Sequence, residues 1–86
     1  MKKFVCFGVS SNTNSFGLWG HRMMSEDGEY WEIALNDINK LYRGQTVQVA
    51  LDGHGQPNWG NLGAEIPHFH GIAPPNVIAE CWKLPV

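Results

Sequence analysis

The chain has 86 residues, of which 43% are hydrophobic and 16% are charged, and its formal net charge at pH 7 is −2. A chain of this length forms a single domain, residues 1–86, with a small core. Its six lysines and arginines are scattered, which argues against nucleic acid as a partner, because phosphate binding needs grouped cations. Few charges also leave apolar side chains on the surface, so we expect a homo-oligomer that covers them.

The chain begins with two lysines and an apolar run over residues 4–9. This run is shorter than the ~7–15 apolar residues of a signal peptide, and polar residues follow it. No stretch approaches the ~20 apolar residues that cross a bilayer. We therefore expect a cytoplasmic protein that does not contact a membrane, and we interpret Lys3–Val9 as a central strand that is apolar on both faces.

Residues 10–15 predict a polar loop, and a hairpin follows it. Its first strand lies within residues 16–24, where His21 and Arg22 point to opposite faces, so that one of them lies inward or at an edge. An Asp-Gly pair predicts the turn, and residues 29–35 predict the return strand. The alternation in this strand predicts three side chains in the core: Trp31, Ile33 and Leu35.

The second half of the chain gives weaker patterns. Apolar residues at helical spacing predict one short helix at about residues 37–43, which a glycine ends. Alternation predicts strands over 45–53 and 76–84, and residues 64–70 predict a short extended piece, which Pro67 restricts to a sheet edge. The predicted fold is therefore α+β and β-rich: a small curved antiparallel sheet or half-open barrel of four or five strands with one short helix.

The two cysteines, Cys6 and Cys81, lie near opposite ends of the chain. In a reducing compartment we expect both to be free, buried thiols. They are neighbours only if the first and last predicted strands pair, and the sequence leaves this open.

The long stretch 53–75 shows little periodicity, and segments of this kind are often functional or covered by a partner. His68 and His70 point to the same face of an extended strand, so they can converge on one metal ion. A third ligand would be His54, with Asp52 or Glu65 as alternatives. The plainer interpretation is that these imidazoles are solvated side chains on an edge segment.

Trp59 in the same stretch allows two interpretations. With Asn58 beside it, the indole can present a flat apolar face to a small molecule or a glycan. Alternatively, it packs onto the sheet and anchors the loop, as large aromatic side chains usually do. The candidate binding residues are therefore His54, Asn58, Trp59, His68 and His70.

No nucleophile elbow, phosphate loop or fixed metal-ligand spacing occurs in the chain. The sequence does not determine a function, and it favours a binding or interaction module for a protein or a small molecule, with no cofactor, over an enzyme. The alternative is a small metalloprotein or metal-dependent enzyme that uses His54, His68 and His70.

Overall fold

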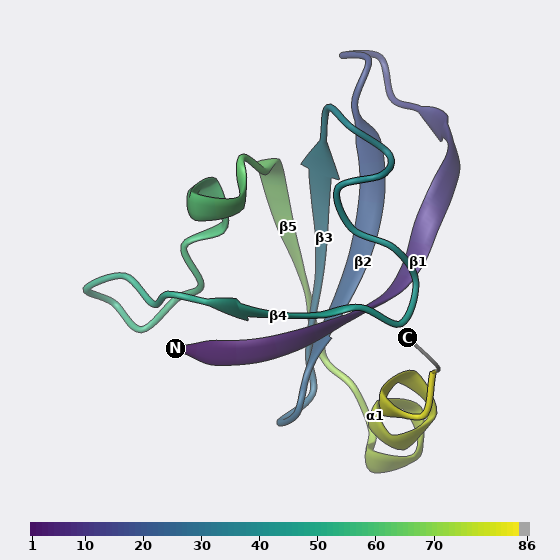
Figure 1. Ribbon diagram of the computed structural model, residues 1–86. Helices are drawn as coiled ribbons and strands as arrows, with labels where there is room; N and C mark the ends of the chain where they lie inside the picture. The colour runs from purple at the N-terminus through teal and green to yellow at the C-terminus, as the bar shows by residue number, and fades with distance from the viewer. Residues whose placement is uncertain (85–86) are drawn as a thin grey trace.

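The computed structural model describes residues 1–84, which form one antiparallel sheet of five strands in the order β4-β1-β2-β3-β5. Figure 1 shows the sheet strongly curved and open, with one short helix, α1, below it. The predicted fold class is therefore confirmed. The elements are β1 Lys2–Thr13, β2 Trp19–Ser25, β3 Glu29–Leu35, β4 Thr46–Val49, the 3-10 helix η1 Trp59–Leu62, β5 Glu65–Ile72 and α1 Pro75–Trp82.

The predicted hairpin is formed by β2 and β3, and its alternation determines the main core. The three side chains predicted from β3 are buried on one face of the sheet, which we call the core face. Loops from the second half of the chain cover this face, with the indole of Trp59 packed against Phe4 at a ring-centroid distance of 4.7 Å. His21 is the inward residue of its pair: it is fully buried on the core face, and its Nδ1 lies 3.0 Å from the carbonyl oxygen of Trp19.

Strand β1 is longer than predicted, because it continues through most of the segment expected to be a polar loop. Its pairing with β2 shifts by one residue between Cys6 and Gly8, which is a β-bulge at Phe7. A bulge bends a strand and increases its twist, and β1 indeed curves across the whole sheet in Figure 1. The bulge also places Phe7 beside Tyr30, with ring centroids 5.2 Å apart.

The helix predicted at about residues 37–43 is wrong. This segment forms two successive turns, in which the Lys40 amide donates to the Asp37 carbonyl and the Gln45 amide to the Tyr42 carbonyl. Side chains compete for the backbone, since the Asn39 amide donates to the Asp37 carboxylate and the Tyr42 amide to the Gln45 side chain. A segment this short also gains too few intrahelical hydrogen bonds to offset helix nucleation.

The strand predicted over 76–84 is also wrong, because this segment forms α1. Pro75 stands in the first turn of the helix, where its missing N–H costs nothing. Ile78, Cys81 and Trp82 follow at helical spacing and pack on the sheet, and the Trp82 indole donates to the Ser25 carbonyl at 3.1 Å. The alternation of small and large residues in this segment is therefore incidental.

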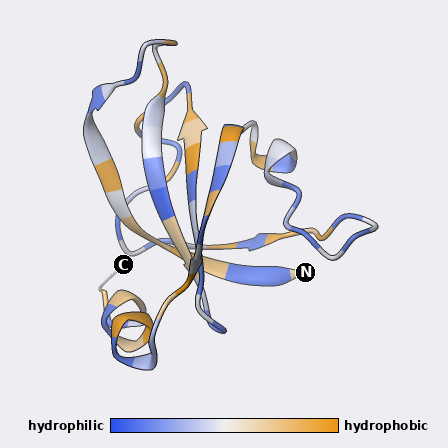
Figure 2. Ribbon diagram, turned by 180° about the vertical axis from the view of Figure 1, so that it is seen from behind, coloured by the Kyte–Doolittle hydropathy of each residue, from blue (hydrophilic) through white to orange (hydrophobic). Residues whose placement is uncertain are grey.

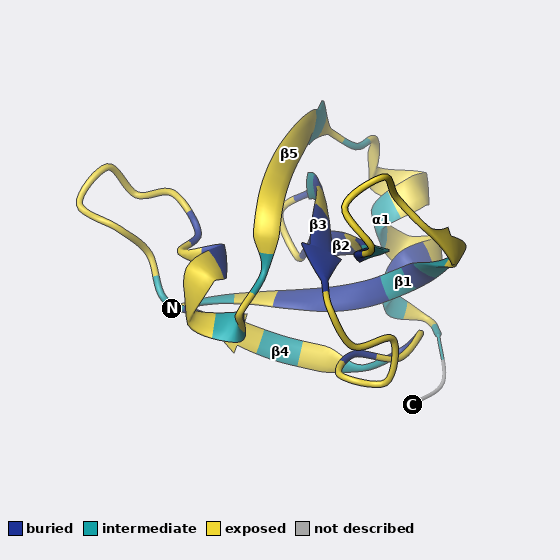
Figure 3. Cartoon of the chain, turned by 90° about the horizontal axis from the view of Figure 1, so that it is seen from above, coloured by how far each residue is buried: buried dark blue, intermediate teal, exposed yellow. Residues whose placement is uncertain are grey.

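Both edges of the sheet are short or interrupted. Strand β4 covers only part of the predicted 45–53 segment, and Leu51 beyond it is 42% exposed. Strand β5 confirms the extended piece expected around Pro67, and Figure 3 shows it exposed along almost its whole length, in contrast to β1. Pro67 and two register shifts in the pairing with β3 make this edge strand irregular. No helix among residues 1–84 has the length and hydropathy needed to span a bilayer.

The face of the sheet opposite the core face is divided into two halves. Helix α1 packs over one half, around Val5 and Met24, and Cys81 of the helix is buried there. Cys6, in contrast, belongs to the cluster on the core face, so both thiols are free and lie on different sides of the sheet. Figure 2 shows hydrophilic segments in the middle of β2 and along β5, away from the hydrophobic side of α1. We call this uncovered half the open face.

Candidate functional site

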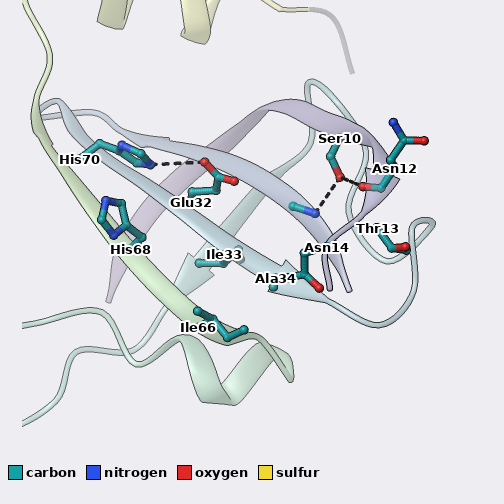
Figure 4. A pocket seen from close by; sticks show the side chains of 11 residues that line it. Ser10, Asn12, Thr13, Asn14, Glu32, Ile33, Ala34, Ile66, His68 and His70 are labelled. Atoms are coloured by element: carbon teal, nitrogen blue, oxygen red, sulfur yellow. Dashed lines mark hydrogen bonds and ion pairs between the residues drawn. The ribbon is translucent and has the colours of Figure 1, made fainter. Parts of the chain in front are cut away.

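The open face contains two adjoining hollows, with volumes of about 320 and 440 Å³, that share four lining residues. We call them together the groove. It crosses four strands, because its lining comes from β1, β2, β3 and β5 (Figure 4). The residues that matter for its chemistry are Ser10, Asn12, Gly20, Arg22, Glu32, His68 and His70.

Two glycines within strands make room for the charged side chains of the groove. A Cβ atom on Gly8 would lie 2.4 Å from Nη2 of Arg22, and one on Gly20 would lie 3.1 Å from Oε2 of Glu32. The guanidinium and the carboxylate thus lie directly over glycine backbone. Neither glycine is among those with positive φ, so the backbone conformation does not require them. Because glycine within a strand lowers stability, these two positions indicate a need for open space.

Arg22 and Glu32 are direct cross-strand partners in the β2–β3 pairing. Opposite charges at such positions usually pair with each other. Here they turn apart: the guanidinium carbon of Arg22 lies 5.8 Å from the centre of the Phe7 ring, a cation–π distance. Within residues 1–84, no carboxylate lies within ion-pairing distance of Arg22. The guanidinium therefore faces the groove with its hydrogen-bonding capacity unused by an acid.

Glu32 is paired on the opposite side of the groove. Its Oε1 lies 3.3 Å from Nε2 of His70, and both side chains are partly exposed. The His70 ring stacks on Tyr30 at 4.4 Å with an interplanar angle of 22°, and His68 meets His70 edge-on at 4.4 Å. Figure 4 shows the two imidazoles close to the Glu32 carboxylate on one side of the groove. The stacking fixes the ring of His70 and so orients Glu32.

The part of the groove lined by β1 carries no charged side chain. The Ser10 hydroxyl accepts a hydrogen bond from the Gly20 amide at 2.8 Å and donates one to the Asn12 carbonyl at 2.9 Å. Figure 4 shows these groups facing the wall that carries Glu32 and His70. At the far end of the groove, Ala34 and Ile66 add apolar surface.

Of the residues predicted as binding residues, the structure brings His68 and His70 together and separates them from His54. His54 lies on an exposed turn that is outside the groove lining. Asp52 organises this turn, because its carboxylate accepts the amides of Gln56 and His54, and these hydrogen bonds lower the pKa of Asp52. The predicted three-histidine cluster is therefore not formed.

Trp59 does not present the exposed face considered above. Its indole is 2% exposed in η1 and packs between Phe4 and Trp31, so the second interpretation, that of a loop anchor, describes it. Asn58 precedes it on the surface, where its amide donates to the Ala50 carbonyl at 2.7 Å. The indole is drawn inward because its burial removes a large apolar area from water.

Across residues 1–84, no three side chains of histidine, cysteine, aspartate or glutamate are grouped so that they could hold a metal ion. Glu32 and the two groove histidines are neighbours, but they do not form such a group. The groove is therefore better suited to hydrogen-bond an organic molecule than to coordinate a metal.

The residues that prediction missed are Gly8, Gly20, Arg22 and Glu32. One signal points to them: each glycine stands within a strand, and the pairing places Arg22 and Glu32 on the same face of the sheet. Glycines of this kind often mark the close approach of another group. Recognising the groove also requires the strand order and register, which the sequence does not provide.

Comparison of the chain with protein-family models, curated proteins and solved structures finds no match in any of the three. Its function is therefore argued from the groove and from the contacts around it.

Proposed function

We propose that the protein is a binding module and that the groove on the open face receives a small polar molecule. The observation that carries this proposal is the pair of glycines beneath Arg22 and Glu32. Two within-strand positions give up stability, and the space that they leave holds two charged groups in a hollow that polar side chains also line. Oriented polar groups around a shaped hollow are the usual composition of a ligand site.

The size of the groove favours a small molecule over a protein partner. Its two hollows, about 320 and 440 Å³, fall in the range of pockets for small ligands. Its lining is mostly polar, whereas the centre of a protein interface is depleted in charged residues. Of the large exposed hydrophobic residues only Ile66 lines the groove, whereas others, such as Phe16 and Tyr42, lie outside it in the part of the chain that the structure describes. The homo-oligomer expected from the low charge stays a prediction, and it would have to use other surfaces.

The proposal is tested by nuclear magnetic resonance on the 15N-labelled full chain. Separate titrations use amino acids, monosaccharides, short dicarboxylates and small diamines, and the reporters are the backbone amides of Gly8, Ser10 and Gly20. We expect at least one of these classes to shift the reporter amides in a saturable way. In the variant Gly20→Thr, whose side chain fills the groove, the shifts should disappear while the rest of the spectrum is preserved. If no class shifts the reporters, or if the variant binds equally well, the proposal is wrong.

A further inference from the structure

The separation of Arg22 and Glu32 defines the charge pattern that a ligand of the groove has to match. The two side chains lie on opposite partners of one cross-strand pair, and they line the same hollow together with Ser10 and Asn12. Each is held away from the other, Arg22 by Phe7 and Glu32 by His70. The groove thus presents one positive and one negative group, and the ion pairs found among residues 1–84 do not join them.

We propose that the groove binds a free α-amino acid as its zwitterion, an inference that rests on the proposed function. The guanidinium of Arg22 can hold the ligand carboxylate through two parallel hydrogen bonds, which its planar donors favour. The carboxylate of Glu32 accepts from the ligand ammonium within the hollow that Asn12 also lines. The ligand then replaces the direct Arg22–Glu32 pair that the cross-strand geometry would otherwise allow.

Other ligand charges fit less well. An anion that bound Arg22 would bring its charge close to Glu32, and a cation that bound Glu32 would lie close to Arg22. A neutral sugar would satisfy hydrogen bonds but would not neutralise either charge. Only a ligand that carries both charges close together is attracted by both Arg22 and Glu32.

The hollow of about 320 Å³ offers space for the side chain of the amino acid. It continues from Glu32 towards Ala34 and Ile66 and is bounded by His68 (Figure 4). This lining combines apolar surface with an imidazole that can donate or accept a hydrogen bond. We therefore expect the protein to discriminate between amino acids by their side chains, with glycine among the weaker ligands because it leaves this hollow unfilled.

The test titrates the full chain with each standard L-amino acid and measures the affinity of the strongest by calorimetry. The N-acetyl derivative, which lacks the ammonium, and the methyl ester, which lacks the carboxylate, should each bind at least about tenfold more weakly. Arg22→Gln and Glu32→Gln should cause losses of the same size. Arg22→Lys should retain part of the affinity, because it keeps the charge and loses the planar fork.

Matched controls are available on the surface outside the groove. Arg43→Gln removes a guanidinium and Glu26→Gln removes a carboxylate, and neither residue lines the groove, so both variants should bind as the wild type does. Equal binding of the amino acid and its two blocked derivatives would overturn the inference. If sugars, dicarboxylates or diamines shift the groove amides and amino acids do not, this inference fails while the proposed function stands. If nothing shifts them, both fail.

Discussion

The two halves of the sheet face opposite the core face differ, although the same strands form them. In the half under α1, Val5, Met24 and Cys81 form a compact apolar cluster that excludes water. In the open half, the strands continue with glycines and charged side chains, and α1 does not extend over them. The difference shows that one sheet face can serve stability at one end and binding at the other, with the change of role at Phe7 and Tyr30.

One glycine in each half of this sheet face illustrates the difference between the covered half and the open half. Gly28 in the β2–β3 turn has a φ of +92°, and a Cβ there would lie 2.8 Å from Cδ1 of Ile78 in α1 and 3.1 Å from the Ala73 carbonyl oxygen. Both the turn and the docking of the helix therefore require glycine at this position. Gly20 in the open half has neither requirement: the nearest atom to its virtual Cβ belongs to the flexible side chain of Glu32. Its role is to leave space.

The largest effect is expected from truncating a side chain beneath the helix. Met24→Ala should lower the free energy of unfolding by about 2–5 kcal/mol, because a fully buried side chain leaves a cavity. Glu32→Ala, on the neighbouring strand in the open half, should change it by about 0.5 kcal/mol or less. Urea denaturation of the two variants measures both values. Comparable losses would show that the open half also supports the fold.

The second prediction compares the two glycines. Gly28→Ala should cost about 1–3 kcal/mol, because an L-residue is strained at that φ and its Cβ meets backbone. Gly20→Thr should leave stability unchanged or raise it by up to about 1 kcal/mol, because a β-branched residue suits a strand and Glu32 can move aside. Thermal and urea unfolding of the two variants measure whether each substitution lowers or raises the free energy of unfolding. A clear loss in Gly20→Thr would mean that Gly20 is structural and would remove the main support for the groove.

The smallest effect concerns charge at the turn end of the covered half. The Ser25 hydroxyl and the Lys2 ammonium donate to Asp27 and hold the pKa of its carboxyl below the ordinary value of 3.8. Since the folded pKa is the lower one, the stabilisation is complete above that value and is lost as the pH falls below it. It should be small, because the side chain is 65% exposed.

Melting temperatures at about pH 6 and about pH 3 measure this contribution. The wild type should lose slightly more stability on acidification than Asp27→Asn, in which position 27 no longer titrates. An equal loss in the two proteins would show that other carboxylates account for the whole acid dependence.

Prediction succeeded where local pattern and final packing agree. The β2–β3 hairpin has an Asp-Gly turn and strict alternation, so its core side chains, Trp31, Ile33 and Leu35, follow directly from the sequence. The two helix errors have the opposite origin. Residues 37–43 have the apolar spacing of a helix, but side-chain acceptors compete for their backbone amides. Residues 76–82 have a pattern that fits either a strand or a helix, and packing on Val5 and Met24 selects the helix.

The candidate site was only half accessible to prediction. His68 and His70 share a face in any extended strand, and the structure places both in the groove. Their expected partner His54 belongs to a separate turn, and the partners that they have, Tyr30 and Glu32, depend on the pairing of β3 with β5 and its two bulges. A shift of one residue in that register would turn the imidazoles to the other face.

The sequence by itself determined a small β-rich domain, because its length limits the core and its alternation specifies strands and an inward face. The tertiary structure alone decided that α1 covers half of the opposite face and that Arg22 and Glu32, although cross-strand partners, turn apart over two glycines. The physical reason is that the alternation of polar and apolar residues determines structure only over a few neighbouring positions. Strand order, register and the reach of a packed helix arise only when segments far apart in the chain bury their surfaces against each other.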